Sequence, residues 1–295
     1  MIDFRTETFL SVCGNMSYTK AAAELNITQP AVSQHISYLE ENYGAKLFEY
    51  KSRTLRLTEA GEELYRAALT MRHDEGKLRE KIKNLKTGSK SLIFGATRTI
   101  GDFDLPPKLA RYLKNNPGTM VKVRLDNTKR LLEMLDTGEI DFALIEGYFA
   151  KSDYGYRAYS SEPFAAVAAP GVCPEECALE ALLDKTLIVR ENGSGSRRIL
   201  ERFLTERNSA TSDFKNVVEI NSIHAIKSLA AAGCGLTFLY KSAAAAELKS
   251  GKLVEVKIND MNLKHDYSFV WRKDSIYEDE YLEIMSEITT WQRRD

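Results

Sequence analysis

The stretch over residues 17–44, SYTKAAAELNITQPAVSQHISYLEENYG, constrains the fold of this chain more than any other. It predicts a small alanine-rich helix capped by Ser17, a tight turn, and a second helix capped by Thr28. Pro30 falls in the first turn of that second helix, where a missing N–H costs little. Residues 3–13 carry apolar side chains at helical spacing, so we expect a further helix to cover this pair.

The second helix of the pair has one apolar and one polar face. At roughly 100° per residue, the stripe expected to face the core consists of Val32, Ile36, Leu39 and Tyr43. The opposite face consists of Pro30, Ser33, Gln34 and Ser37. Gln and Ser both donate and accept hydrogen bonds, which suits base edges in a major groove. An ordinary solvated face fits the same pattern, because helix-turn-helix geometry also occurs in proteins that never touch DNA.

A short basic hairpin is expected to follow over residues 47–57. Lys51, Arg53 and Arg56 alternate there with leucines, and such a wing places basic side chains on phosphates or in a minor groove. Residues 1–57 hold six positive and six negative side chains, but four of the six positive ones lie within 46–56. Binding would therefore depend on this local patch and on two copies of the domain.

A family resemblance runs through the whole of this segment without gaps. The residues that carry it are Phe9, Ser17, Ala21-Ala22, Leu25, Thr28-Gln29-Pro30-Ala31-Val32-Ser33, Ile36, Leu39-Glu40, Gly44, Leu47-Phe48 and Leu57-Thr58-Glu59-Ala60-Gly61. They closely resemble the N-terminal domain of LysR-type transcriptional regulators. The resemblance implies a winged helix-turn-helix domain over 1–57 that binds double-stranded DNA. Tyr50 departs from the family, which often has an arginine after Phe-Glu, and this removes one expected phosphate contact.

The DNA contacts expected from residue chemistry and from this resemblance come from the two helices and the wing. They are Ser17, Thr19, Thr28, Gln29, Pro30, Ser33, Gln34, Ser37, Lys51 and Arg53.

A long helix is predicted from Thr58 to about residue 86, with a glycine stop at Gly88. Its apolar seam, which only Glu75 interrupts, consists of Leu64, Ala68, Met71, Leu78, Ile82 and Leu85. A single helix cannot bury such a stripe, so we expect residues 58–89 to form a dimerisation helix and hinge. The homodimer, or a tetramer built from it, would present two DNA-binding domains to two half-sites. The alternative is that the seam packs on the chain's own C-terminal domain.

From residue 90 the pattern changes to alternating strands and helices, which is typical of an α/β sheet. The first of these segments predict a βαβαβ unit with parallel strands, and a second set begins near Pro163. A strand over 266–271 and a helix over 278–291 then complete the first set. We predict two α/β lobes in a clamshell, similar to periplasmic binding proteins. Lobe I spans 90–162 and 266–295, and lobe II spans 163–265.

The phrases LPPKLARYLKNNPG, LDTGEIDFALIEG and AIKSLAAAGCGLTFL extend the resemblance to the effector-binding domain of the same family. In α/β sheets, ligands bind beyond the carboxyl ends of strands. The glycine-serine turn at 191–197 leads into a helix, where free amides, hydroxyls and Arg197 can converge on an anion. A capped loop with a surface arginine is the alternative reading of this turn.

By resemblance, this turn and the segments after the first two strands line the family's effector cleft. The expected contacts are Thr97, Arg98, Thr99, Ile100, Asn127, Thr128, Glu146, Gly193, Ser194, Ser196, Arg197 and Ile223. Arg98 stands where many relatives have a small polar residue, which favours a carboxylate, a phosphate or an oxyanion of sulfur. The effector would move the lobes, change the oligomer geometry and so alter transcription of target genes.

Other classes of function find little support. The four histidines, His35, His73, His224 and His265, have no acid and nucleophile at a recognisable spacing, so we expect no enzyme activity and no cofactor. Cys173 and Cys177 lack further ligands nearby, so we expect unpaired thiols and no metal site. A solute-binding protein for transport would share the clamshell but needs a signal peptide. With no long apolar run, the expected location is the cytoplasm, away from the membrane.

Overall fold

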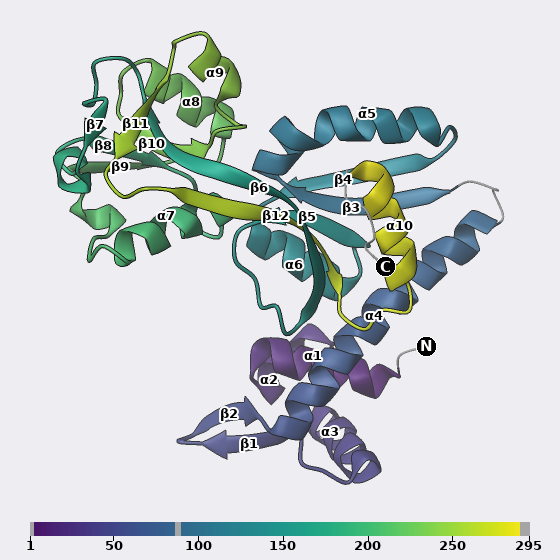
Figure 1. The fold of residues 1–295 in the computed structure, drawn as a ribbon. Coiled ribbons are helices and arrows are strands. Elements are labelled where there is room, and N and C mark those ends of the chain that lie inside the picture. The colour runs from purple at the N-terminus through teal and green to yellow at the C-terminus, as the bar shows by residue number, and fades with distance from the viewer. Residues whose placement is uncertain (1–2, 86–89, 290–295) are drawn as a thin grey trace.

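The structure, a computed structural model, describes residues 3–85 and 90–289. Its N-terminal domain is the predicted winged helix-turn-helix (Figure 1). The elements are α1 (Phe4–Asn15), α2 (Tyr18–Glu24), α3 (Gln29–Tyr43), β1 (Phe48–Lys51) and β2 (Thr54–Leu57). Ser17 and Thr28 accept hydrogen bonds from the amides of Lys20 and Ala31, which confirms both helix caps.

The core of this domain confirms most of the predicted stripe. Phe9, Val12, Val32 and Ile36 are buried together where α1 and α3 meet. The prediction for Tyr43 is wrong, because its side chain is more than half exposed. Tyr43 is the last residue of α3, and the left-handed Gly44 turns the chain away directly after it.

The wing is a hairpin with a two-residue turn. Lys51 pairs with Thr54, and the two residues between them, Ser52 and Arg53, have positive φ angles of 52° and 65°. This geometry matches the twist of the flanking strands and places Arg53 at the tip of the wing. It also strains two residues that are not glycine.

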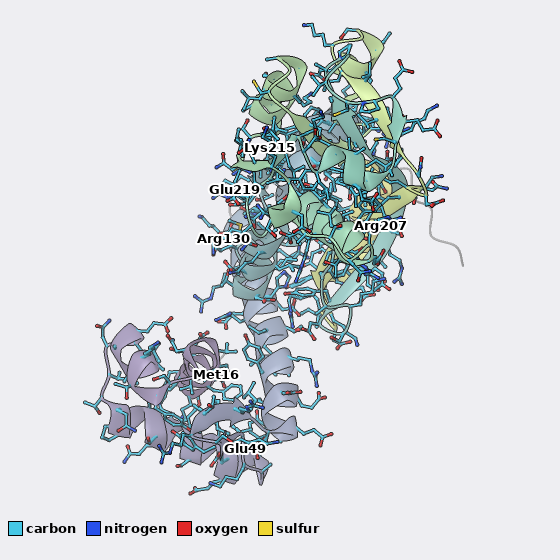
Figure 2. All side chains as sticks on the ribbon, turned by 90° about the vertical axis from the view of Figure 1, so that its left-hand side faces the viewer. Met16, Glu49, Arg130, Arg207, Lys215 and Glu219 are labelled. Carbon is cyan, nitrogen blue, oxygen red and sulfur yellow. The ribbon has the colours of Figure 1, made fainter. Side chains whose placement is uncertain are left out.

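Helix α4 (Glu59–Leu85) links the two halves of the molecule, as Figures 1 and 2 show. Four of the six predicted seam residues form an exposed apolar stripe, and from here on the seam means these four, Met71, Leu78, Ile82 and Leu85. The prediction that Ala68 belongs to the dimerisation seam is wrong, because Ala68 is fully buried against Leu10 and Leu69 of its own chain. Leu64 likewise packs on the N-terminal core, so neither residue extends the seam. The predicted stop at Gly88 lies outside the described residues.

Lobe I confirms the predicted βαβαβ unit. Its elements are β3 (Ser91–Thr97), η1 (Ile100–Asp104, a short π-helix), α5 (Leu105–Asn115), β4 (Met120–Asp126), α6 (Thr128–Thr137) and β5 (Phe142–Glu146). The three strands are parallel in the order β4-β3-β5. Alternate residues of β5 face opposite layers, with Phe142 in the layer under α5 and Ala143 in the layer over α6.

Two long strands run from one lobe into the other (Figure 1). They are β6 (Tyr154–Ala168) and β12 (Leu263–Arg272), which pair antiparallel over their whole common length. The lobe boundaries proposed after residues 162 and 265 therefore fall inside continuous strands. The sheet runs β4-β3-β5-β12-β6-β10-β8-β9, with β11 against β6.

Lobe II follows the predicted alternation. Its elements are β7 (Glu176–Cys177), η2 (Leu179–Leu182), β8 (Thr186–Val189), α7 (Gly195–Thr205), η3 (Thr211–Asp213), β9 (Asn216–Glu219), α8 (Ile223–Ala231), β10 (Leu236–Tyr240), α9 (Ala245–Lys249) and β11 (Val254–Ile258). Helix α10 (Glu278–Ile288) returns to lobe I and packs beside α5. Residues 290 and 291 of the predicted last helix lie outside the described residues.

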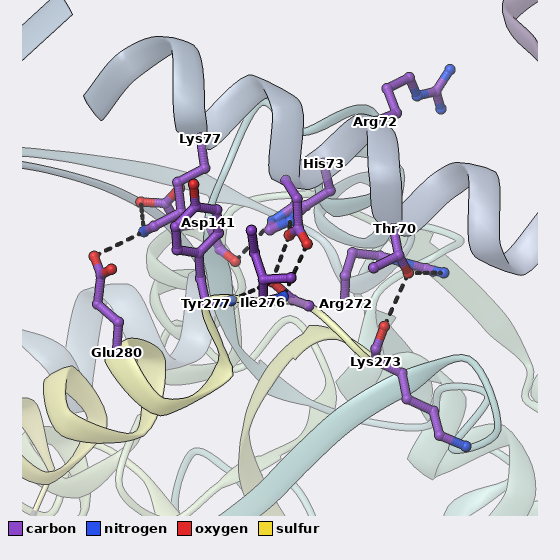
Figure 3. Close-up of polar contacts among 12 residues, drawn as sticks. Thr70, Arg72, His73, Lys77, Asp141, Arg272, Lys273, Ile276, Tyr277 and Glu280 are labelled. Atoms are coloured by element: carbon purple, nitrogen blue, oxygen red, sulfur yellow. Dashed lines mark hydrogen bonds and ion pairs between the residues drawn. The ribbon is translucent and has the colours of Figure 1, made fainter. Parts of the chain in front are cut away.

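A polar face of α4, which the sequence did not reveal, packs on lobe I (Figure 3). His73 and Lys77 are buried there, and Asp74 nearly so. The Nε2 atom of His73 lies 3.1 Å from the carbonyl oxygen of Asp141, and Asp74 accepts a hydrogen bond from the amide of Ile276 at 3.0 Å. The alternative that the seam packs on the C-terminal domain is therefore wrong, because a different face of α4 makes that contact.

Candidate functional site

The first candidate surface is a groove of about 480 Å³ between α2, α3 and the wing. Six of the ten residues expected to contact DNA line it, namely Ser17, Thr19, Gln29, Ser33, Ser37 and Arg53. Within it the Gln29 amide donates a hydrogen bond to the Ser33 hydroxyl at 3.1 Å. This contact orients the amide at the N-terminal end of α3, where it remains exposed.

The other four expected residues lie outside that groove. Thr28, Pro30, Gln34 and Lys51 are all exposed, the first three at or near the start of α3 and the last in the wing. The sequence reasoning missed Tyr50, which lines the groove and is 72% exposed. An aromatic side chain stands where an arginine was expected, so this position offers stacking and a hydroxyl in place of a cation.

Most of the positive charges of this domain that form no ion pair, within the part of the chain that the structure describes, lie on the wing. Lys46 and Arg5 are paired with Glu40 and Asp3 of the same domain. By contrast, Lys51, Arg53 and Arg56 are exposed and form no ion pair within the described residues 3–85. The local excess of positive charge therefore lies on the wing, beside the N-terminal end of α3.

The second candidate surface is the cleft between the lobes. The residues after β5 and β8 meet there, since a Cβ on Gly195 would lie 2.2 Å from the carbonyl oxygen of Glu146. The Thr128 hydroxyl donates to that same oxygen at 3.0 Å. Gly147 adopts a φ of 107°, and a Cβ on it would lie 2.7 Å from the Cα atom of Gly195. Only glycine at both positions permits this approach of the lobes.

Further contacts join the lobes on either side of this approach. Arg198 of lobe II donates to the carbonyl oxygen of Tyr148 in lobe I at 3.3 Å. On the other side, Phe103 of lobe I packs into the lobe II core, with the Lys227 ammonium 4.5 Å from its ring centre. The lobes are thus in contact at both ends of the cleft.

A groove of about 430 Å³ opens at the first of these ends. Expected effector residues among its lining are Thr128, Gly193, Ser194 and Arg197. Asn127 caps α6 by accepting a hydrogen bond from the amide of Arg130, and it faces Gly193. The structure thus brings the first turn of α6 and the glycine-serine turn before α7 to the same groove.

The predicted role of Arg197 needs correction. Its Nε donates to Glu201 at 2.8 Å, and its Nη1 donates to Glu219 at 2.6 Å. Both carboxylates belong to lobe II, so the guanidinium charge is already neutralised. Ile100 and Ile223 are also corrected, because both are buried in the cores of their lobes.

At the strand ends beside this cleft, five buried polar atoms have no hydrogen-bond partner among the described residues. They are Thr97 Oγ1, Arg98 Nε, Glu146 Oε2, Arg190 Nη1 and Tyr240 OH. Each belongs to the last residue of a parallel strand of its lobe or to the residue directly after it, in β3, β5, β8 or β10. Sequence reasoning missed Arg190 and Tyr240, although the rule that ligands bind at strand carboxyl ends could have found them.

Glu146 is the acidic member of this set. Burial raises the pKa of its carboxyl from 4.5 to about 7, against the opposing effects of a hydrogen bond with Thr99 and of the positive charge of Arg190. Tyr240 stays a neutral donor, because burial holds its pKa well above the usual value. Ser194 and Ser196 are buried as well and bond each other at 3.0 Å.

Neither a metal-binding cluster nor a membrane-spanning helix is present among the described residues, 3–85 and 90–289. No group of three histidine, cysteine or acidic side chains there could hold a metal ion. No helix in that part of the chain is both long and apolar enough to cross a membrane.

Comparison with known proteins matches both halves of the chain. Residues 5–62 match the family described as bacterial regulatory helix-turn-helix protein, lysR family, and residues 86–277 match the LysR substrate binding domain. The HTH-type transcriptional activator CmpR of Synechocystis is 30% identical over 271 residues, covering 90% of this chain and 88% of that protein. CysL of Bacillus subtilis is 28% identical over 270 residues, covering 90% and 89%.

Solved structures share the fold at lower identity. An OxyR mutant of Corynebacterium glutamicum has a TM-score of 0.60 at 23% identity, covering 97% of this chain and 89% of that one. The regulatory domain of Synechocystis CcmR, solved in complex with 2-PG, has a TM-score of 0.59 at 21% identity and covers 68% of this chain and 98% of that one.

Proposed function

Because the chain belongs to the LysR family of transcriptional regulators, we propose that it is a sequence-specific regulator whose C-terminal clamshell binds a small anionic effector. Members of this family bind DNA and small-molecule effectors, form oligomers and are not enzymes. We place its action in the cytoplasm, where a regulator of this kind meets DNA. The observation that carries the proposal is the pairing of the groove beside α3 with a second, buried polar site between the lobes.

Sequence recognition rests on the exposed N-terminal part of α3. Gln29 and Ser33 can exchange hydrogen bonds with base edges, because both donate and accept. Arg53 at the tip of the wing supplies positive charge to a phosphate or to the adjacent minor groove. One domain has few such contacts, so high affinity requires two domains bound at once.

The seam on α4 supports a homodimer as the way to present two domains. Its four side chains are 47 to 81% exposed in a single chain, which is unusual for large apolar residues spaced along one helix. Pairing of two α4 helices would bury them at steps of seven, four and three. A tetramer of two such dimers is our proposal for the full assembly.

An anionic effector is supported by the donors in the cleft. Four of the five unpartnered buried atoms belong to guanidinium or hydroxyl groups, which can donate to an anion. Two structural neighbours were solved with a small molecule bound, 2-PG in CcmR and the effector Arg in LysG of Corynebacterium glutamicum. By binding one arrangement of the lobes more tightly than another, the effector would shift the geometry of the oligomer.

A thermal-shift screen of small anions against the full chain tests the effector. Carboxylates, phosphate esters and sulfonates at millimolar concentration should include at least one that raises the melting temperature, since a ligand of the folded state stabilises it. Arg98→Gln should abolish that shift, whereas Arg130→Gln, on the outer surface of lobe I, should keep it. A screen in which only cations or neutral compounds stabilise the chain contradicts the anionic effector.

A further inference from the structure

The buried polar atoms of the cleft include both hydrogen-bond donors and an acceptor, so they require different partners. Arg98 Nε and Arg190 Nη1 are donors, and Tyr240 OH and Thr97 Oγ1 can be. Glu146 Oε2 is an acceptor when the carboxyl is ionised. A buried polar atom without a hydrogen-bond partner destabilises the folded state. Each of these atoms therefore indicates whether the ligand offers a donor or an acceptor at that place.

Glu146 interacts electrostatically with Arg190 and Tyr240, two other members of this set. It pairs with Tyr267 across β5 and β12, and the Tyr267 ring lies 5.0 Å from that of Tyr240. Its carbonyl oxygen contacts Gly195 of the other lobe. A ligand held between the lobes by Arg190 would therefore lie beside the Glu146 carboxyl.

A purely anionic ligand does not fit this arrangement. It would satisfy the guanidinium and hydroxyl donors, but it would put a second negative charge against a buried carboxylate, where like charges repel strongly. The positive charge of Arg190 cannot offset this repulsion in full, because its Nε and Nη2 atoms already donate to Glu191 at 2.8 and 3.0 Å.

We infer that the effector carries a hydrogen-bond donor, a hydroxyl or an ammonium, next to its anionic group, and that Glu146 accepts from that donor. This inference rests on the proposed function and narrows it to hydroxy acids and amino acids, or to phosphate esters with a free hydroxyl or amine. Donors of the ligand would then face Glu146, and its anionic oxygens would face the arginines.

Protonation of Glu146 is the competing route, since a neutral carboxyl tolerates a plain anion. The ionisable and charged groups around this carboxyl are Arg190, Glu191, Tyr159, Tyr240 and Tyr267. In that case a plain anion would bind with uptake of a proton. Its affinity would fall about tenfold for each pH unit above the Glu146 pKa of about 7.

The test compares matched acids on the full chain at pH 8. Propionate, lactate and alanine form one set, and succinate, malate and aspartate form another, each set differing in one substituent. In at least one set the hydroxy or amino acid should raise the melting temperature at least twice as much as its parent. Glu146→Met should erase that difference, and Glu255→Met, the same change on the outer part of lobe II, should keep it.

The outcomes separate the inference from the function on which it rests. Parent acids that bind as well as their substituted partners at pH 8 overturn the inference alone. If the parent acids bind as well as their substituted partners only below pH 7, the inference is overturned and protonation of Glu146 explains the binding. No shift with any of these acids, or with any phosphate ester or sulfonate of the screen above, contradicts the anionic effector as well. Glu146→Gln keeps a hydrogen-bond acceptor at this position but removes the charge. If the variant still binds the effector, the donor of the effector is a hydroxyl, and if binding is lost, the donor is an ammonium.

Discussion

The Nζ atom of Lys77, on the polar face of α4, lies 3.2 Å from Oδ2 of Asp141, directly before β5. Glu280 of α10 lies 3.3 Å from the same ammonium, and the Tyr281 ring centre is 4.5 Å away. Three segments distant in sequence thus meet at one buried cation (Figure 3). Helix α4 is therefore fixed to lobe I, and a movement of lobe II relative to lobe I is also a movement relative to α4.

Lys77→Met should destabilise the protein by about 3 kcal/mol, because it leaves the carboxylate of Asp141 buried without its cation. Urea denaturation measures this loss as a change in the unfolding free energy. Lys81→Met is the matched control, since Lys81 also pairs with Glu280 but is nearly half exposed. It should cost less than about 1 kcal/mol. Equal losses in both variants would show that the Lys77 pair is not effectively buried.

Glu146→Gln should change the pH dependence of stability. The folded-state pKa of Glu146 is raised, so between pH 4.5 and about 7 the folded protein holds a proton that the unfolded chain releases. Stability should therefore fall as pH rises through this window and level off above it. The difference is on the order of 3 kcal/mol, since each pKa unit is worth about 1.4 kcal/mol.

The neutral glutamine does not titrate, so the variant should gain stability relative to the natural chain at pH 8 but not at pH 4.5. Denaturant titrations at the two pH values give the comparison. Glu255→Gln, at a partly exposed ion pair with Lys241, should leave the pH dependence unchanged. Parallel curves for Glu146→Gln and the natural chain would mean that Glu146 titrates normally.

Leu78→Glu should break the proposed contact between two α4 helices, because it places a charge in the middle of the seam. Sedimentation velocity at micromolar concentration should then give a smaller mass than that of the natural oligomer. Leu113→Glu is the control, since Leu113 is similarly exposed but lies on α5, away from α4. A Leu78→Glu protein that keeps the mass of the natural oligomer would place the dimer contact elsewhere.

The elements that the sequence predicts well are those with local signals. Ser17 and Thr28 cap their helices from within three residues, and the turn between them needs no distant partner. The exposed four of the six predicted residues of the α4 stripe are likewise visible from their spacing in the sequence. Ala68 shares that spacing, and only its position against Leu10 makes it part of the core.

The elements that the sequence does not predict depend on distant partners. His73, Asp74 and Lys77 look like a solvated face, because Asp141 and Ser275 approach them only in the folded chain. One partner of Arg197, Glu219, is likewise distant at 22 residues, whereas its other partner, Glu201, lies at i+4 in the same helix and could have been found from spacing. Pairing with a residue distant in sequence leaves no local pattern, so charged groups gave the largest errors in the candidate site.

Arg53→Ala should weaken DNA binding on all sequences alike. In the proposed complex the arginine at the tip of the wing would contact the backbone or the minor groove, so its loss would remove about one phosphate contact in each protomer. The slope of log affinity against log salt should fall by roughly 2 for the dimer. Arg130→Ala, on lobe I, should leave that slope unchanged. Loss of preference at a single base pair would instead assign Arg53 to base readout.

Selection from a pool of randomised duplex DNA tests the central claim most directly. The dimer of the full chain should enrich two half-sites separated by whole helical turns, because two α3 helices have to enter successive major grooves. Gln29→Ala should relax the preference at one base pair in each half-site, at about 1 to 3 kcal/mol. A pool that shows no enriched sequence after repeated rounds with the natural protein would contradict the account.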